Sequence, residues 1–308
     1  MDILQEHLVR ARASGGVFAR SVAVAPWGLS LPGSIQLAVH AVIQGQAWIW
    51  ADGGQAQALE LRPGDLALVR GGPDHFIAHA PGANCVSPEE FRVRHPQDDA
   101  EHDPRAAVFL CGAYRFAGDI GAGLVASLPP VLSIPARLDD PIHGVVGLLS
   151  RELSHAEPGR QTVLDRLLDV LVVMGIRTGL AISSNAPAWF RGASDPRLAR
   201  ALQAMHGDTS RPWTVDQLAG MSHMSRATFT RVFQDVLGNA PIRYLTEWRM
   251  TVARDLLRTQ DLSLDEVAER VGYTSLYAFT TAFRRHHGQP PGRWRLGQRE
   301  LAGATVMH

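Results

Sequence analysis

The chain has 308 residues, enough for two domains, and its 45% hydrophobic and 19% charged residues are ordinary for a globular protein. Its formal net charge is zero, but residues 195–308 contain 15 Arg against 11 acidic residues, while residues 1–194 contain 15 Arg against 19. No apolar run is long enough to span a bilayer, and the N-terminus lacks the basic and apolar regions of a signal peptide. We therefore expect a cytoplasmic protein with no membrane partner, whose basic C-terminal part fits a nucleic-acid-binding module.

Residues 17–116 are predicted to form short β-strands. Apolar, β-branched runs at residues 35–49 and 66–69 are separated by turns that contain Gly and Pro, such as Pro32-Gly33. Short strands at regular spacing with such turns indicate a sandwich or a barrel. The Asp52-Gly53 pair fits a hairpin turn, in which positive φ angles are needed.

A helical hairpin is predicted over residues 138–183. Apolar residues recur at helical spacing in its first helix, and its second helix follows Pro158-Gly159 and has a wide apolar face. Two interpretations of this hairpin stay open, which are packing on the barrel and a homodimer interface. The barrel that precedes the hairpin is assigned to residues 1–137. Residues 184–195, which follow the hairpin, have the composition of a linker.

The C-terminal region repeats itself at a spacing of 50 residues. The matched pairs are Ser225/Ser275, Phe229/Phe279, Thr230/Thr280, Phe233/Phe283, Gly238/Gly288 and Pro241/Pro291. Upstream the spacing is 49 residues, as in Leu218 and Val267, so the difference of one residue falls in a turn. The repeat predicts two copies of one helical unit within residues 196–298.

Each copy carries the signals of a helix-turn-helix unit. In the first copy, a capping box of Thr214 and Gln217 opens a short helix, and Ser225 caps a second helix that ends at Gly238. The equivalent residues of the second copy are Ser263, Glu266, Ser275 and Gly288. A helix over residues 241–259 is predicted to connect the copies and to fix their relative placement. The alternative is a helical packing domain with solvated Arg side chains, but two copies with matched caps favour DNA binding.

The second helix of each copy is predicted to enter a major groove of promoter DNA, because the early residues of a recognition helix reach base edges. The outward positions of the first copy are Arg226, Ala227, Thr230, Arg231 and Gln234. Those of the second copy are Leu276, Tyr277, Thr280, Thr281 and Arg284. The inward positions of the second copy are predicted to be Ala278, Phe279, Ala282 and Phe283.

In this region the sequence resembles the AraC/XylS family of transcription regulators. The residues that carry the resemblance include Pro212-Trp213-Thr214, Met224-Ser225-Arg226, Pro241-Ile242-Arg243-Tyr244-Leu245, Trp248-Arg249-Met250, Val271-Gly272-Tyr273 and Gly288-Gln289-Pro290-Pro291. One departure is His223, which stands where the second copy has the turn glycine Gly272. The resemblance implies a gene activator or repressor, usually a homodimer, that is controlled by its N-terminal domain. As an activator it would have RNA polymerase as a partner.

The N-terminal barrel resembles a cupin that has lost most of its metal ligands. Gly64, Gly72 and His75 keep the spacing of the second cupin motif, although Arg70 and His79 replace its proline and asparagine. In the first motif, the position of the glutamate ligand is occupied by Ala38. The metal site of a cupin enzyme is therefore largely absent. We expect no required cofactor and no enzymatic activity, although a cupin dioxygenase or isomerase is the competing interpretation.

Three polar residues are candidates for a sensor site in the barrel. His40, His75 and Cys111 could converge there, because His40 shares a strand face with Ala38. Such a set suits a ligand pocket with two hydrogen-bonding imidazoles, a divalent metal such as zinc, or merely buried histidines satisfied by the backbone. The cysteines Cys85 and Cys111 add a redox sensor as a further alternative. The sequence thus predicts an α+β protein, in which a cupin-like barrel with a helical hairpin senses a small molecule or an oxidant and controls an all-α double helix-turn-helix domain.

Overall fold

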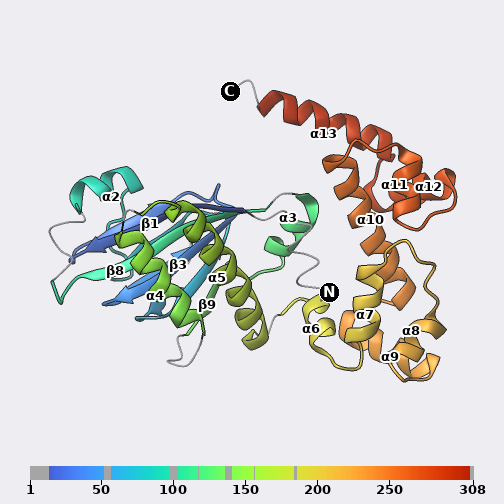
Figure 1. Ribbon diagram of the computed structural model, residues 1–308, viewed down its shortest axis with the longest axis horizontal. Helices are drawn as coiled ribbons and strands as arrows, with labels where there is room; N and C mark the ends of the chain where they lie inside the picture. The colour runs from blue at the N-terminus through green and yellow to red at the C-terminus, as the bar shows by residue number, and fades with distance from the viewer. Residues whose placement is uncertain are drawn as a thin grey trace. The chain divides into compact units, whose positions relative to one another are not determined.

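The computed structural model describes residues 14–51, 57–96, 103–116, 118–135, 141–155, 157–183 and 186–305. The chain divides into two compact units, one formed by Ala13–Phe116 and Val125–Ala186, and the other containing Ala117–Leu124 and Pro187–His308. The first unit is rich in strands and the second is helical (Figure 1). The predicted α+β class is therefore confirmed. No helix among the described residues is long and apolar enough to cross a membrane.

The first unit is built from two antiparallel sheets. The five-stranded sheet has the order β1 (Ser14–Ala23), β8 (Ala107–Arg115), β3 (Leu37–Gln44), β6 (Leu66–Arg70) and β9 (Val131–Ile134). The four-stranded sheet has the order β2 (Gly28–Leu31), β7 (His75–Ala78), β4 (Ala47–Ala51) and β5 (Leu59–Leu61). The apolar run at residues 35–49 thus forms two strands, because Gly45 turns the chain with a φ of 72°. The turn predicted at Asp52-Gly53 lies outside the described residues.

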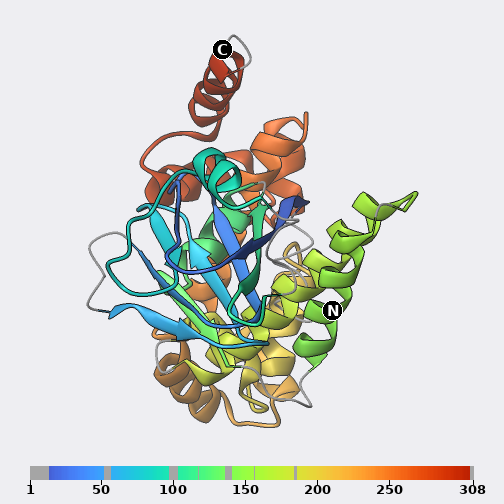
Figure 2. The ribbon, with the colours of Figure 1, turned by 90° about the vertical axis from the view of Figure 1, so that its left-hand side faces the viewer.

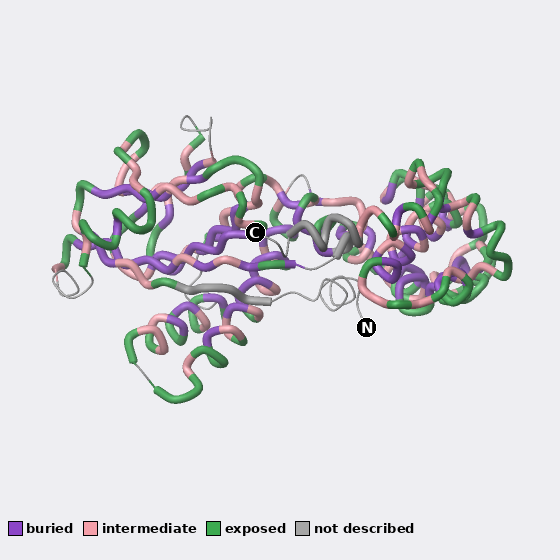
Figure 3. The backbone as a smooth tube through the Cα atoms, turned by 90° about the horizontal axis from the view of Figure 1, so that it is seen from above, coloured by how far each residue is buried: buried purple, intermediate pink, exposed green. Residues whose placement is uncertain are grey.

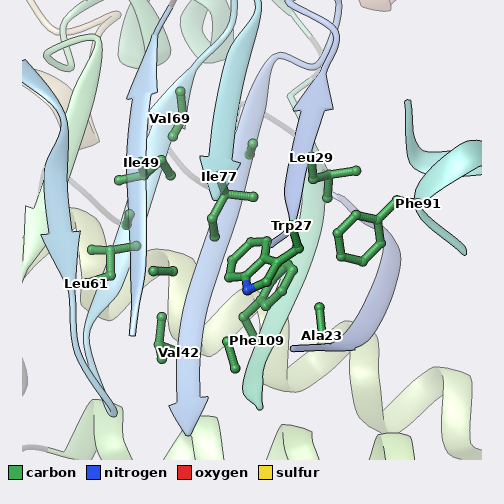
Figure 4. Close-up of a cluster of buried hydrophobic side chains, with 14 residues drawn as sticks. Ala23, Trp27, Leu29, Val42, Ile49, Leu61, Val69, Ile77, Phe91 and Phe109 are labelled. Atoms are coloured by element: carbon green, nitrogen blue, oxygen red, sulfur yellow. The ribbon is translucent and has the colours of Figure 1, made fainter. Parts of the chain in front are cut away.

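The core of this unit lies between the two sheets (Figure 4). Trp27 stacks on Phe109 with 4.8 Å between ring centroids, and Phe91 meets both rings edge-on. Phe91 belongs to helix α2 (Pro88–Arg94), whose first turn is capped because the Ser87 hydroxyl accepts a hydrogen bond from Glu90 N. The helix therefore contributes a side chain to the apolar interior next to strand β2.

The predicted helical hairpin consists of α4 (Pro141–Ser154) and α5 (Arg160–Ile182), which pack on the five-stranded sheet (Figures 1 and 2). Two glycines bring α5 close to the strands: a Cβ at Gly179 would lie 2.5 Å from Leu132 Cδ2, and one at Gly175 would lie 2.8 Å from Leu66 Cδ2. Packing on the barrel is therefore the role of the buried face of α5. Figure 3 shows that the strands are mostly buried, while the hairpin keeps an exposed side.

The other compact unit is helical throughout its described residues. Its helices are α6 (Ala188–Ser194), α7 (Ala199–Gly207), α8 (Val215–Met221), α9 (Arg226–Leu237), α10 (Pro241–Thr259), α11 (Leu264–Arg270), α12 (Leu276–His287) and α13 (Pro291–Thr305). Helix α10 has the predicted bounds of the connecting helix. Helix α6 falls within the predicted linker but packs on α9, where Gly192 allows the approach of Leu237. Helix α3 (Gly118–Ala126) completes the described helices.

Candidate functional sites: two helix-turn-helix units and a barrel cavity

The first helix-turn-helix unit is formed by α8 and α9, and its caps follow the sequence prediction. The Thr214 hydroxyl accepts from Gln217 N at 3.2 Å, and the Gln217 side chain accepts from Thr214 N at 3.1 Å, which completes the capping box. The Ser225 hydroxyl caps α9, and the helix ends at Gly238, whose φ is 75°. Local hydrogen bonds thus fix both ends of the unit.

The second unit, formed by α11 and α12, repeats these contacts. The Ser263 hydroxyl accepts from Glu266 N at 3.2 Å, and the Glu266 carboxylate accepts from Ser263 N at 2.7 Å. Ser275 caps α12, which ends at Gly288 with a φ of 78°. In both units the paired phenylalanines of the second helix are fully buried, namely Phe229, Phe233, Phe279 and Phe283. Each unit therefore has its own apolar core, and its other face is left for solvent or a ligand.

Most of the predicted DNA-contacting residues lie on the exposed faces of α9 and α12. The exposed ones are Arg226, Ala227, Arg231, Gln234, Leu276, Tyr277, Thr281 and Arg284. Thr230 and Thr280 are only half-buried, and the Thr230 hydroxyl donates to the carbonyl of Arg226 at 2.9 Å. Ala278, which was expected to face inward, is exposed, because it lies in the first turn of α12.

The turn between the two helices differs between the units. His223 adopts a left-handed conformation with φ of 51°, and Gly272 has a φ of 79°. Both turns therefore have the same backbone shape, although only one of them has the residue that adopts it without strain. His223 is exposed, and Arg200 donates to its Nε2 at 3.1 Å.

Gly272 lies against a half-buried arginine of the connecting helix. The Arg249 guanidinium donates to the carbonyls of Thr209, at 2.9 Å, and Arg211, at 2.7 Å, in the loop before α8. A Cβ at Gly272 would lie 2.6 Å from Arg249 Nη2 and 2.5 Å from the carbonyl oxygen of Ser210. We call this contact between α10, the loop and the turn of the second unit the Arg249 bracket. Through it, the turn of the second unit packs against the loop that leads into the first.

In the barrel, His40, His75 and Cys111 come together as the sequence predicted. His40 and Cys111 lie opposite each other on β3 and β8, with 3.2 Å between Nδ1 and Sγ. His75 reaches across from β7 in the other sheet, with 3.0 Å between the two Nε2 atoms. Both histidines are about 98% buried or more. The three side chains therefore form a hydrogen-bonded chain between the sheets.

This arrangement gives no support to a zinc site. His75 and Cys111 contact opposite nitrogens of the His40 ring, so the three side chains cannot bind one ion together. Among the described residues there is no group of three or more His, Cys, Asp or Glu side chains that could hold a metal. The predicted convergence of the residues is real, but it is a relay of hydrogen bonds.

Burial keeps the members of this relay uncharged. Desolvation lowers the pKa of His40 well below its ordinary value of 6.5 and that of His75 to about 4, and it raises the pKa of the Cys111 thiol to about 12. A neutral imidazole has one N–H group, so both contacts of His40 run in one direction. Either Cys111 donates to His40 and His40 to His75, or the order is reversed.

Cys85 lies apart from the relay, on the loop after β7. Its thiol is within 3.4 Å of the carbonyl oxygen of Ala83, and desolvation by burial raises its pKa as well. Both cysteines are free thiols. Cys85 also lies at a close approach of the chain, because a Cβ at Gly28 would be 2.8 Å from its Sγ.

A cavity of about 250 Å³ lies beside the relay. His40 and Cys111 form part of its wall, while His75 lies behind His40. Sequence reasoning missed the side of the cavity formed by α2, although Ser87-Pro88-Glu89-Glu90 is a helix-start signal that could have revealed this helix. The remaining lining is Ala19, Ser21, Leu29, Leu31, Ile35, Ala38, Pro88, Phe91, Arg92, Gly112 and Ala113. The cavity is therefore mainly apolar.

The neutral histidines make the stability of the protein depend on pH. Between pH 6.5 and about 4, an unfolded chain binds protons at His40 and His75 that the folded chain does not, so the free energy of unfolding falls as the pH falls. From pH 7 to 5.5 we expect a loss of about 2–3 kcal/mol from the two residues together. Chemical denaturation at several pH values measures it. His75→Gln should remove about half of this slope, and an equal slope in the variant and the wild-type protein would contradict the assignment.

Comparison with known proteins identifies both units. Residues 2–181 match a cupin family, and residues 218–297 match a helix-turn-helix domain family. An AraC-like transcription regulator from Streptomyces antibioticus is 30% identical over 307 residues, which cover 96% of this chain and 98% of that protein. The chain belongs to the AraC-like transcription regulators.

Two other regulators match most of the length of this AraC-like regulator. The HTH-type transcriptional regulator AlkR of Acinetobacter baylyi is 28% identical, over 87% of this chain and 90% of its own. The RCS-specific HTH-type transcriptional activator RclR of Escherichia coli is 27% identical, over 98% and 100%. Among solved structures, the DNA-binding domain of AdpA in complex with a target DNA is 36% identical over 35% of this chain and 96% of its own, with a TM-score of 0.33. These relatives are named as regulators, not as cupin enzymes.

Proposed function

We propose that this AraC-like regulator binds promoter DNA through α9 and α12 and that the occupant of the barrel cavity controls its output. The observation that carries the proposal is the pair of helix-turn-helix units on the continuous helix α10, each with a free recognition face. Arg231 and Gln234 on α9 have the donors and acceptors that bind guanine and adenine edges. The equivalent face of α12 is available to the next major groove, about one helical turn away.

The signal that fits the barrel best is a small apolar molecule. The imidazole nitrogens of His40 are engaged by Cys111 and His75, so the histidine in the wall already has its hydrogen-bond partners. An apolar cavity of about 150 Å³ can hold benzene. A cavity of about 250 Å³ therefore suits a ring with one or two substituents. The His40–His75 relay adds no charge to the wall, and the charged side chain in the lining is that of the exposed Arg92.

A redox signal is the competing proposal, and one relative is named an RCS-specific activator. Oxidation by peroxide-type reagents proceeds through the thiolate, and reactive cysteines have a lowered pKa. Here burial raises the pKa of Cys85 and that of Cys111, to about 12 for the latter. The thiols are therefore protonated at neutral pH, which favours the ligand over the oxidant.

The proposal is tested by mapping the genomic sites that the full chain binds and then coupling one of these promoters to a reporter gene. The double variant Arg226→Ala/Arg231→Ala should lose these sites. Ala38→Phe, which fills the cavity wall, should abolish the response to small aromatic compounds, while Cys85→Ser should keep it. Reporter output that rises with the amount of regulator would indicate an activator, for which RNA polymerase is the expected partner. Enrichment of no site by the full chain would contradict the proposal, and loss of response only in Cys85→Ser would favour the oxidant.

We also propose that the regulator is a homodimer through the exposed side of its helical hairpin. Leu148 on α4 and Val163 and Val170 on α5 remain 43–45% exposed after the hairpin has packed on the sheet. Apolar side chains left outside the core on adjacent helices are typical of a subunit interface.

The double variant Leu148→Asp/Val170→Asp should convert the dimer to a monomer, because it introduces two desolvated carboxylates per subunit into the interface. Light scattering of the full chain at micromolar concentration measures the mass. Val93→Asp is the matched control, since Val93 is an exposed valine, 81% accessible, on α2. If the wild-type protein has the mass of a monomer, the dimer proposal is wrong and the hairpin packs only within its own chain.

A further inference from the structure

The two recognition helices present different chemistry at equivalent positions. The 50-residue repeat pairs Arg226 with Leu276 and Arg231 with Thr281, so each arginine of α9 is replaced on α12. Their caps and buried phenylalanines are the same, as described above. These two differences lie on the exposed face, where the fold does not require them.

The first turn of α12 presents an apolar patch to solvent. Tyr277 is 82% exposed and the adjacent Leu276 is 36% exposed. The equivalent positions of α9 hold Arg226, whose side chain is 67% exposed and ion-paired with Asp216 at 3.2 Å, and Ala227. Among the described residues, no large hydrophobic side chain is more exposed than Tyr277. Such exposure in a recognition helix points to a partner that covers it when the helix is bound.

The major groove offers a specific partner for each face. Arginine binds the O6 and N7 atoms of guanine with two hydrogen bonds, whereas the C5-methyl group of thymine is the apolar group that apolar side chains contact there. Leu276, Tyr277 and the Thr281 methyl group match thymine, and Arg231 matches guanine.

We propose that the operator of this regulator is chemically asymmetric: the half-site under α9 is read at G·C pairs through Arg231, and the half-site under α12 is read at the methyl groups of thymines. This inference rests on the proposed function, since it names what the two units read on promoter DNA. Arg284 lies about two turns beyond Tyr277 on α12, at the position of Gln234 in the first unit. In this assignment it contacts a phosphate and not a base.

The first experiment selects binding sites for the purified full chain from random duplex DNA. We expect a two-part motif with half-sites about 10 base pairs apart, one defined by G·C pairs and the other by A·T pairs. A motif in which both halves are defined by G·C pairs would overturn the inference while supporting the proposed function. Enrichment of no motif would overturn the proposed function itself, and this inference with it.

The second experiment changes single atoms of the selected site. Uracil in place of thymine removes the methyl group, and it should weaken binding about 4-fold per contacted base in the α12 half-site. In the α9 half-site, 7-deazaguanine removes N7, which is one of the two acceptors for arginine, and should weaken binding about 2- to 12-fold. In Tyr277→Ala, uracil should no longer weaken binding at the α12 half-site. In Arg231→Ala, 7-deazaguanine should no longer weaken binding at the α9 half-site.

The internal repeat supplies a reciprocal control. Arg231→Thr gives α9 the residue of α12, and Thr281→Arg gives α12 the residue of α9. Both positions are exposed, so both variants should unfold at nearly the same denaturant concentration as the wild-type protein. Repeated selection with Thr281→Arg should add a G·C pair to the α12 half-site, and Arg231→Thr should lose one from the α9 half-site. Unchanged motifs in both folded variants would overturn the assignment of these residues.

Discussion

Alanine in place of Gly272 is expected to lower the free energy of unfolding by about 2–5 kcal/mol, whereas glycine in place of His223 should leave it unchanged or raise it by up to about 1 kcal/mol. The two residues occupy the same turn of the two units. An alanine at residue 272 must adopt the left-handed conformation and also place its Cβ 2.5 Å from a backbone oxygen. Glycine at residue 223 relieves the conformational strain and loses only the exposed hydrogen bond from Arg200.

Chemical denaturation of the full chain measures both changes. The informative result is that the free energy of unfolding falls in Gly272→Ala but not in His223→Gly. If the turn tolerated no substitution at all, both variants would be destabilised. Gly220→Ala is a suitable control: Gly220 is exposed in α8, has open space around its Cβ position, and should become slightly more stable as alanine. A loss of similar size in Gly272→Ala and His223→Gly would contradict the packing described for the Arg249 bracket.

Binding of the full chain to its operator should weaken about a hundredfold between 50 and 200 mM salt, as expected for about four arginine–phosphate contacts. The chain has no lysine, so the side chains that can carry these contacts are arginines. Several lie on the exposed surface of the second helix-turn-helix unit, including Arg284 and Arg285. Each contact releases counterions from DNA, so the logarithm of the affinity falls linearly with the logarithm of the salt concentration.

The variant Arg285→Ala should reduce the slope of this salt dependence by about 0.9 without changing the preferred sequence. Arg231→Ala should instead relax the preference at one operator position. Arg105→Ala is the control, since Arg105 is ion-paired with Asp103 in the barrel unit. A slope near zero for the wild-type protein would mean that its basic surface does not contact DNA.

The double helix-turn-helix unit could be predicted from the sequence because its signals are local. A capping box, a left-handed glycine and a buried phenylalanine pair each act within a few residues, and the repeat doubles every signal. The same locality explains one error, since Ala278 sits where helical spacing alone places an inward residue. In the structure it lies in the first turn of α12, before the helix meets the core.

Features that depend on contacts between distant residues were harder to predict. The convergence of His40 and His75 could be expected from cupin spacing. Which nitrogen of His40 each neighbour contacts depends on how the two sheets face each other, which the sequence does not show. This detail rules against the zinc alternative, because Cys111 and His75 contact opposite nitrogens. Helix α6 was assigned to a linker because its stretch contains Ser, Pro and Gly. Its Phe190 and Gly192 are buried only through their packing in the helical unit, which no local pattern shows.

The Arg249 bracket has a consequence for the DNA. Arg249 binds the entry loop of the first unit, and the turn of the second unit packs against both, so we expect the offset between α9 and α12 to change little from one duplex to another. Any mismatch with the helical repeat of B-DNA must then be absorbed by bending or twisting of the base pairs between the half-sites. The elastic cost of that deformation depends on their sequence, so flexible TA or CA steps in this untouched spacer should bind the regulator more tightly than a stiff A-tract.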